Sequence, residues 1–244
     1  MSDDDLLRYS KHIMLETVGI NGQEKLQNST MLLIGLGGLG SISSQYLAAS
    51  GVGHLILADF DIVELSNLQR QTIHYTNDIG KLKIQSAKEK LLKINPNIKI
   101  SLVENLDNCL NEWVLKSDIV LDGTDNFKTR FLINDSCVKN KTPLVSAAVI
   151  RFEGQISVFK GYEANKPCYE CLYNPTDFID ETCTNSGILS PFAGVLGSLQ
   201  ATMAIKVLLN IGELLDEKLL VIDADSMEFR QIRLSKDLQC KCCI

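Results

Sequence analysis

The sequence lacks the features of a nucleic-acid-binding, membrane-associated or secreted protein. Its 24 lysines and arginines are outnumbered by 30 acidic residues, which gives a formal net charge of −6. This balance argues against bulk attraction to nucleic acid or to an anionic membrane. The first residues, MSDDDLLRYSKHIML, are acidic where a secretory signal would be basic, so no signal peptide is predicted.

Uninterrupted hydrophobic runs of membrane-spanning length are also missing. The most apolar stretch, from Phe192 to Ile211, contains Gln200, Lys206 and several small residues. This pattern favours a helix buried in the core or at a dimer interface over a membrane span. Eight cysteines without a secretory signal favour a reducing compartment, the cytoplasm, where cysteine pairs more often indicate metal or redox chemistry than disulfides.

What remains is the composition of an ordinary globular protein, without internal repeats or low-complexity linkers. The chain has 244 residues, of which 45% are hydrophobic and 22% are charged. Such a chain suits one large α/β domain. We therefore predict a single domain over residues 1–244, which is divided into a first half at 1–150 and a second half at 151–244.

A glycine-rich stretch from Thr30 to Ser41 organises the rest of the sequence. A short apolar run precedes the glycines and a helical segment follows them; the glycines are Gly35, Gly37, Gly38 and Gly40. Strand, glycine turn and helix in this order let backbone N–H groups approach a phosphate closely. A second strand ends at Asp59, about 20 residues after the turn, where a carboxylate can bind ribose hydroxyls. The stretch predicts a nucleotide site, with an unliganded βα turn as the alternative.

Hydrophobic patterning predicts a Rossmann-like, mostly parallel sheet that is flanked by helices and ends in antiparallel strands. The acidic residues Asp3 to Asp5 predict one N-terminal helix that continues through LLRYSKHIMLETVG. Further elements are a βαβ unit over 31–61, a helix over 81–94, strands over 98–103, 118–121 and 143–149, antiparallel strands from 154, a helix over 193–209 and a closing hairpin. A long polar loop lies between the antiparallel strands and the last helix.

Two CxxC pairs give the strongest metal signal. Cys168 and Cys171 form one pair, and Cys240 and Cys243 form the other. Four thiolates can hold one tetrahedral zinc ion in a closed structural site, which would attach the C-terminal tail to the body. Free or redox-active cysteines are the alternative, because the gap between the pairs is far longer than in a zinc ribbon. Cys242 is then a spare thiol.

Charged residues near the predicted nucleotide site suggest chemistry other than hydride transfer. Arg70, Lys83 and Asp125 are each unremarkable surface residues when taken alone. Cleavage of a triphosphate, however, requires cations on the leaving group and a carboxylate for Mg²⁺. The histidines His12, His54 and His74 form no triad or metal pattern, so none is assigned a role.

Together, GLGGLG, the acid after the second strand, LSNLQRQ, TDN and the two CxxC pairs resemble the MoeB/ThiF/HesA adenylyltransferases. These are the bacterial relatives of ubiquitin-activating enzymes, and the resemblance runs from about Leu7 to Cys243. The stretch VIRFEGQISVF is more similar to the molybdopterin-synthase adenylyltransferase branch than to the thiamine branch. The resemblance implies adenylation of the C-terminal Gly-Gly carboxylate of a ubiquitin-like sulfur carrier with ATP and Mg²⁺, and a carrier-binding and zinc-binding second half.

The resemblance also implies a set of site residues. It implies Gly38 on the phosphates, Asp59 on the ribose, Arg70 and Asn67 on the triphosphate with Lys83 beside them, and Asp125 on Mg²⁺. Other nucleotide-binding positions that it implies are Gly35, Gly37, Gly40, Asp61, Ser66, Leu68, Gln69 and Asn126. It implies Zn²⁺ on the four cysteines of the CxxC pairs. Cys183 matches the family's loop cysteine, which takes part in sulfur or thioester chemistry in some members; the alternative is an incidental exposed thiol.

Family members act as homodimers, and one departure in this sequence bears on that arrangement. Lys11 stands where the family usually has an arginine that reaches the partner subunit's ATP, and lysine keeps the charge but loses the bidentate fork. We expect a homodimer and a separate sulfur donor protein, because the chain ends at Ile244 without a sulfurtransferase domain. The alternatives are an NAD-dependent oxidoreductase, or a non-catalytic binder of ubiquitin-like proteins held together by zinc.

Overall fold

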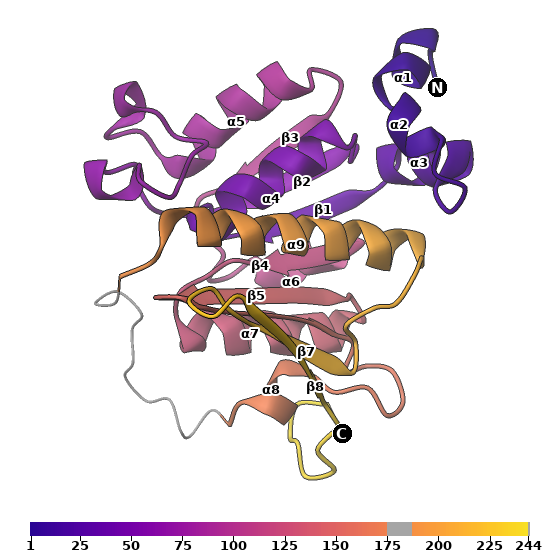
Figure 1. The fold of residues 1–244 in the computed structure, drawn as a ribbon, viewed down its shortest axis with the longest axis vertical. Helices are drawn as coiled ribbons and strands as arrows, with labels where there is room; N and C mark the ends of the chain where they lie inside the picture. Colours follow the sequence, from indigo (N-terminus) through magenta and orange to yellow (C-terminus); the bar gives the residue numbers. More distant parts are fainter. Residues whose placement is uncertain (175–186, 244) are drawn as a thin grey trace.

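The computed structural model describes residues 1–174 and 187–243 (Figure 1). In this part of the chain one eight-stranded sheet has the order β3-β2-β1-β4-β5-β6-β7-β8. The parallel strands are β1 (Thr30–Ile34), β2 (His54–Ala58), β3 (Lys99–Val103), β4 (Ile119–Asp122) and β5 (Leu144–Ile150). The antiparallel strands are β6 (Glu153–Phe159), β7 (Lys218–Asp223) and β8 (Glu228–Arg233). This confirms the predicted α/β class and the change to antiparallel pairing.

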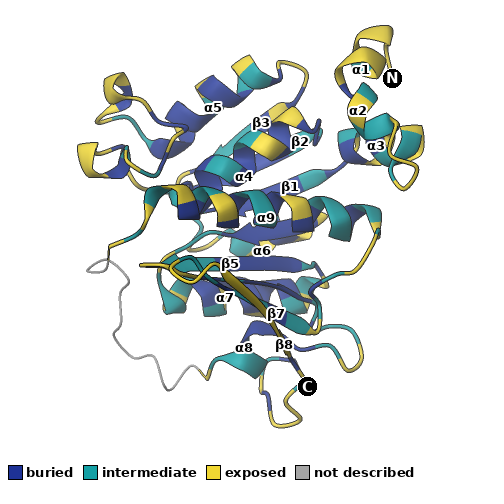
Figure 2. Cartoon of the chain, viewed as in Figure 1, coloured by how far each residue is buried: buried dark blue, intermediate teal, exposed yellow. Residues whose placement is uncertain are grey.

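Helices cover both faces of the parallel strands (Figures 1 and 2). One face carries α4 (Gly38–Ala49), α5 (Lys83–Ile94) and α9 (Ser190–Leu209), and the other carries α6 (Leu110–Leu115), α7 (Phe127–Asn140) and α8 (Tyr169–Leu172). Side chains alternate along β1, so that Met31 and Leu33 join the first core while Leu32 and Ile34 join the second. Burial on both faces explains why these strands are apolar throughout.

The apolar segment from Phe192 to Ile211 forms most of α9. By length and composition alone this helix could cross a membrane, and half of its most apolar stretch is buried inside the fold. It packs against α4 and against β5 and β6 of the sheet. Such packing is that of a core helix, as the interrupting Gln200 and Lys206 indicated.

The N-terminal helix is shorter than predicted. It begins as expected, with the Ser2 Oγ accepting a hydrogen bond from the Asp5 N–H at 3.2 Å. It then divides at Tyr9 into α1 (Asp3–Arg8) and α2 (Ser10–Ile13), and a third helix that the patterning missed, α3 (Gly19–Gln27), follows. Tyr9 is buried and its hydroxyl accepts a 2.8 Å hydrogen bond from the Asn95 Nδ2. A tertiary contact thus decides where the helix breaks.

The carboxyl ends of the parallel strands meet at one edge of the sheet. The glycine turn follows β1, Asp59 follows β2, and the TDN segment follows β4. Because β1 lies between β2 and β4, these three connections are neighbours in space. Open α/β sheets bind their ligands at this edge.

Candidate functional site

The glycine turn is a backbone conformation that a side chain would disrupt. Gly35 has a φ of +89°, and a Cβ atom added there would lie 2.9 Å from the Gly123 carbonyl oxygen. A Cβ atom on Gly40 would lie 2.0 Å from the Gly35 carbonyl oxygen. These contacts press the turn against the end of β4 and start α4 at Gly38. The first N–H groups of that helix therefore open onto the carboxyl edge of the sheet, where an anion can bind them.

A carboxylate and a lysine border this turn. The Asp59 Oδ2 accepts a 2.6 Å hydrogen bond from the Leu36 N–H, and its Oδ1 accepts one of 2.8 Å from the Asp61 N–H. The buried Lys83 places its Nζ 2.7 Å from the Asp61 Oδ2. Burial raises the pKa of Asp59, while the positive charge of Lys83 and the two backbone hydrogen bonds oppose that rise. The cluster thus holds an anionic and a cationic group beside the turn.

Arg70 lies over the glycine turn. Its Cγ would be 3.6 Å from a Cβ atom built on Gly38, and its Nη1 donates a 3.1 Å hydrogen bond to the Ser66 carbonyl. The buried Asn67 closes the short 3₁₀ turn η1 (Leu65–Asn67), where its Oδ1 accepts from the Glu64 N–H at 3.1 Å. The structure therefore brings the LSNLQRQ motif onto the glycine turn.

The rest of that motif lies toward solvent. Ser66 and Gln69 are exposed and Leu68 is half-buried. The Gln69 carbonyl accepts a hydrogen bond from the Ser190 Oγ at the start of α9. The segment is therefore anchored at one end to the helix that crosses the sheet.

A buried carboxylate that sequence reasoning missed fixes the TDN segment. Asp122 is 1% exposed; its Oδ1 accepts from the Thr124 N–H and Oγ1 at 2.9 and 2.7 Å, and its Oδ2 accepts from the Ser146 Oγ at 2.8 Å. Asn126 then caps α7 by accepting from the Thr129 N–H at 2.9 Å. Asp125, between these two anchors, is exposed at the sheet edge.

One predicted residue lies away from this cluster. Lys11 is exposed on α2, next to His12, whose Nδ1 is 3.1 Å from the Gln23 Oε1. Gln23 in turn donates a 2.8 Å hydrogen bond to the Ser50 carbonyl at the carboxyl end of α4. The glycine turn is at the opposite end of that helix, which is about 18 Å long. The chain therefore does not bring Lys11 to its own glycine turn.

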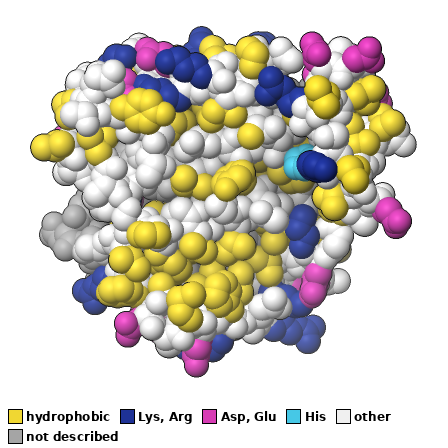
Figure 3. Space-filling model, turned by 45° about the horizontal axis from the view of Figure 1, so that its top comes forward, with side chains coloured by type: hydrophobic (Ala, Val, Ile, Leu, Met, Phe, Trp, Pro, Cys, Tyr) yellow, Lys and Arg dark blue, Asp and Glu magenta, His cyan; other side chains and the backbone are white. Residues whose placement is uncertain are grey.

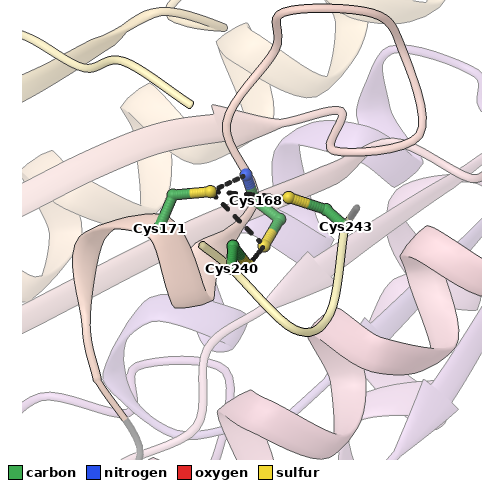
Figure 4. A group of neighbouring side chains, drawn as sticks. All are labelled: Cys168, Cys171, Cys240 and Cys243. Atoms are coloured by element: carbon green, nitrogen blue, oxygen red, sulfur yellow. Dashed lines mark hydrogen bonds between the residues drawn. The ribbon is translucent and has the colours of Figure 1, made fainter. Parts of the chain in front are cut away.

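The four CxxC cysteines converge into one cluster. Their sulfur atoms all lie within 4.8 Å of one another, and Figure 4 shows the side chains pointing together from α8 and from the segment after β8. Neighbouring sulfurs are separated by 3.5, 3.6 and 3.9 Å. Thiolates on a tetrahedral zinc ion stand about 3.8 Å apart, since each Zn–S bond is about 2.3 Å. The spacing and the four soft donors fit a closed zinc site.

Two further cysteines were singled out by the sequence. Cys242 accepts a 3.2 Å hydrogen bond from the Asn134 Nδ2 on α7, so this spare thiol ties the tail to the body from outside the cluster. Cys183 lies outside the described residues.

The chain was then compared with known proteins. The ThiF family matches residues 9–242. The molybdopterin-synthase adenylyltransferase of Escherichia coli is 45% identical over 245 residues, which cover 100% of this chain and 98% of that protein. The adenylyltransferase and sulfurtransferase MOCS3 of Drosophila virilis is 40% identical over 248 residues, and the chain spans 55% of its length.

Solved structures agree with the sequence relatives. MccB from E. coli, crystallised with ATP, superposes with a TM-score of 0.81 at 27% identity, and the match covers 97% of this chain and 74% of that one. The same fold, the glycine turn and the full-length identity all lead to one assignment. The chain belongs to the ThiF family.

Proposed function

We propose that this protein uses ATP to adenylate the C-terminal glycine carboxylate of a ubiquitin-like sulfur carrier, in molybdopterin rather than thiamine biosynthesis. The observation that carries the proposal is the convergence of the glycine turn, Asp59, Arg70 and Lys83 at one sheet edge in a chain that is 45% identical to a molybdopterin-synthase adenylyltransferase. An NAD-dependent oxidoreductase would leave the two cations without a role.

In the proposed reaction a carboxylate oxygen of the carrier attacks the α-phosphorus of ATP. A bond forms between that oxygen and the phosphorus, the α–β bridging bond breaks, and pyrophosphate takes the electron pair. The carboxylate is already ionised near pH 7, so no general base is required. What remains for the protein is positioning and neutralisation of charge.

Different residues of the proposed site position the substrates and neutralise the phosphate charge. The N–H groups of the glycine turn, with Gly38 at the start of α4, hold phosphate oxygens, and Asp59 accepts from the ribose hydroxyls. Asn67, Arg70 and Lys83 bind the triphosphate and stabilise the leaving pyrophosphate. Asp125 would hold Mg²⁺, which when bound neutralises phosphate charge, with Asn126 near the nucleotide. Gly35, Gly37, Gly40, Asp61, Ser66, Leu68 and Gln69 complete the proposed nucleotide site.

We assign zinc to Cys168, Cys171, Cys240 and Cys243 in a structural role. A closed set of four thiolates leaves no position for substrate, so the ion would hold the tail after β8 against α8. Such thiolates persist in the reducing cytoplasm, where we place the protein. We further propose that Cys183 takes part in sulfur transfer and that a separate protein donates the sulfur.

The antiparallel half supplies a docking surface for the carrier. Figure 3 shows hydrophobic side chains gathered on one face of the molecule, and the large exposed hydrophobic residues of the antiparallel half include Phe152, Met227, Phe229 and Ile232. Exposed apolar patches of this kind mark interaction sites. We propose one domain over 1–244, in which residues 1–150 bind nucleotide and 151–244 bind carrier and zinc. In a homodimer, Lys11 would act at the partner's site.

Pyrophosphate exchange tests the activity. We expect ATP–pyrophosphate exchange only when a carrier with a Gly-Gly tail is present, and faster exchange with the molybdopterin-synthase carrier than with the thiamine carrier. An Arg70→Ala variant should lose about 10²–10³-fold in rate, as when one transition-state donor is removed. Lys116→Ala, which removes an exposed cation at the C-cap of α6, is the matched control. Equal exchange in both variants, or none with either carrier, contradicts the proposal.

A second experiment tests the docking surface. Phe229→Asp should raise the KM for the carrier about tenfold while leaving the KM for ATP unchanged, because the residue is 55% exposed on the edge strand β8. Leu115→Asp on α6, at 69% exposure, is the control. Equal carrier KM values for the two variants would place the carrier elsewhere.

A further inference from the structure

His74, to which the sequence assigned no role, is buried beside the glycine turn. His74 comes four residues after Arg70 in the sequence and is 3% exposed. Its Nδ1 is 2.9 Å from the Ser86 Oγ, and its Nε2 is 3.3 Å from the Leu36 carbonyl oxygen. Ser86 lies on α5, and Leu36 stands between Gly35 and Gly37 in the turn. The imidazole therefore bridges the helix that begins with Lys83 and the phosphate-binding backbone.

The neighbours of His74 determine the direction of each hydrogen bond. The Lys90 Nζ has only donors; it hydrogen-bonds the Asp78 Oδ2 and lies 3.2 Å from the Ser86 Oγ. The Leu36 carbonyl can only accept, so the ring proton is on Nε2 and is donated to that carbonyl. In the neutral ring the Nδ1 then accepts, so Ser86 donates its proton to the His74 Nδ1 while its oxygen accepts from Lys90. Burial lowers the pKa of His74 to about 4, so the ring is neutral near pH 7, as this pattern requires.

Both backbone groups of Leu36, the N–H and the carbonyl, take part in hydrogen bonds. Its N–H donates to the Asp59 Oδ2 at 2.6 Å, and its carbonyl accepts from His74. Asp59 and His74 both reach this residue from the connection between β2 and α5, where they are 15 residues apart in sequence. Lys83 is one turn before Ser86 on α5, so the same chain of hydrogen bonds fixes the distance between the lysine and the turn.

We propose that His74 is a positioning residue for ATP: its Nε2–H orients the Leu36 carbonyl, and so keeps the N–H groups of the glycine turn aimed at the phosphates and in register with Lys83. This inference rests on the proposed nucleotide site. Because His74 is 3% exposed and so offers almost no surface to a docked protein, loss of the hydrogen bond should weaken ATP binding without weakening carrier binding.

Two substitutions of His74 distinguish a role in positioning the Leu36 carbonyl from a role in packing alone. In His74→Asn the amide replaces the Nδ1 position and cannot reach Leu36, so we expect the KM for ATP to rise about tenfold, the value of one hydrogen bond. In His74→Gln the amide N–H replaces Nε2, so the KM for ATP should return to within about twofold of wild type. The KM for the carrier should stay the same in both.

Controls make the outcomes distinct. His54→Asn removes a histidine–serine pair of the same 2.9 Å length, His54 to Ser101, at the other end of β2, and should leave the KM for ATP unchanged. Ser86→Ala leaves the ring in place but removes the donor to Nδ1, so it should also raise the KM for ATP, which keeps the test open if His74→Asn does not fold. Melting temperatures establish that each variant is folded.

The inference is overturned if folded His74→Asn and Ser86→Ala bind ATP as wild type does, or if His74→Asn and His74→Gln are equally impaired. Arg70→Ala measured alongside separates this result from failure of the nucleotide site. If Arg70→Ala weakens ATP use and His74→Asn does not, only the role of His74 is wrong. If neither variant changes the KM for ATP, the nucleotide site itself is misplaced.

Discussion

At the scale of single residues, the carboxylate of Asp59 shows how opposing effects set the charge of the site. Burial raises its pKa, whereas the Lys83 charge and the hydrogen bonds from Leu36 and Asp61 lower it. A carboxylate held by two backbone N–H groups has a fixed orientation. Lys83 therefore stabilises the anion beside it, and we propose that it also presents positive charge to the triphosphate.

We expect Lys83→Ala to lower kcat/KM for ATP by about 10²–10³-fold, because the cation that we propose for the leaving group is lost. The measurement is pyrophosphate exchange at saturating carrier. Lys93→Ala removes a cation from the last turn of the same helix and should stay within about twofold of wild type. Similar losses in the two variants would indicate a general effect of charge rather than a contact at Lys83.

The buried His74 makes stability depend on pH. Its pKa is about 4 in the folded protein and 6.5 when exposed, so between these values the unfolded chain binds more protons than the folded one. Stability should then fall as pH decreases from about 6.5 to about 4, by about 1–3 kcal/mol. The charged groups that face the ring are Lys83, Lys90 and Asp78; desolvation and the two lysines depress the pKa, and Asp78 partly offsets them.

Chemical denaturation of wild type and His74→Gln at pH 7 and pH 5 measures the contribution of His74 to the pH dependence of stability. The variant has no imidazole, so its loss of stability between the two pH values should be smaller than that of wild type. Subtracting the loss of stability of the variant from that of wild type cancels the contributions of all groups that the two proteins share. One of these groups is Asp59, whose raised pKa has the opposite effect and favours stability at lower pH. Identical pH dependence would show that His74 is not held neutral by burial.

At the scale of elements, the strand–turn–helix unit from β1 to α4 was predictable because its determinants are local. Glycine spacing, an apolar strand and a helical segment lie within a few turns of one another in sequence. The same holds for the hairpin of β7 and β8 and for the end of α5, just before Pro96. The break at Tyr9 was missed because its cause is a hydrogen bond to Asn95, which is remote in sequence.

Two helical glycines give a matched test of the turn. Gly40→Ala brings a Cβ atom to 2.0 Å from the Gly35 carbonyl oxygen, and the turn must shift. We expect about 1–3 kcal/mol of destabilisation and a higher KM for ATP. Gly194→Ala on α9 meets its nearest neighbour at 3.9 Å and should stabilise by about 0.5–1 kcal/mol. Thermal denaturation and ATP kinetics of the two variants test these expectations. A Gly40→Ala variant with wild-type stability and KM for ATP would contradict the close approach of Gly40 to the Gly35 carbonyl oxygen.

At the scale of the whole molecule, the cysteine cluster joins parts of the chain that are far apart in sequence. Cys168 caps the start of α8 and Cys171 lies within it, while Cys240 and Cys243 follow β8. Without the metal, the tail would be held by few contacts, among them the hydrogen bond from Asn134 to Cys242. Zinc would act as a cross-link between the tail and the body.

Cys240→Ser should reduce bound zinc from about one ion per chain and lower the melting temperature by about 5–10 °C. Elemental analysis and calorimetry provide the two readouts. Cys109→Ser is the control, because the Cys109 Sγ lies outside the cluster and hydrogen-bonds the Asn105 carbonyl. A wild-type protein that contains no zinc after purification in zinc-supplemented medium would exclude the metal assignment.

The sequence by itself determined the α/β class, the glycine turn between β1 and α4, the acid after β2 and the candidate metal donors, because each depends on residues that are adjacent or regularly spaced along the chain. Only the tertiary structure decided which groups meet. It placed Arg70 over Gly38, brought the four cysteine sulfurs together, set Lys11 at the far end of α4 and joined His74 to Leu36. These contacts depend on how strands and helices pack, and no local pattern in the sequence encodes the distance between two atoms on different connections of a sheet.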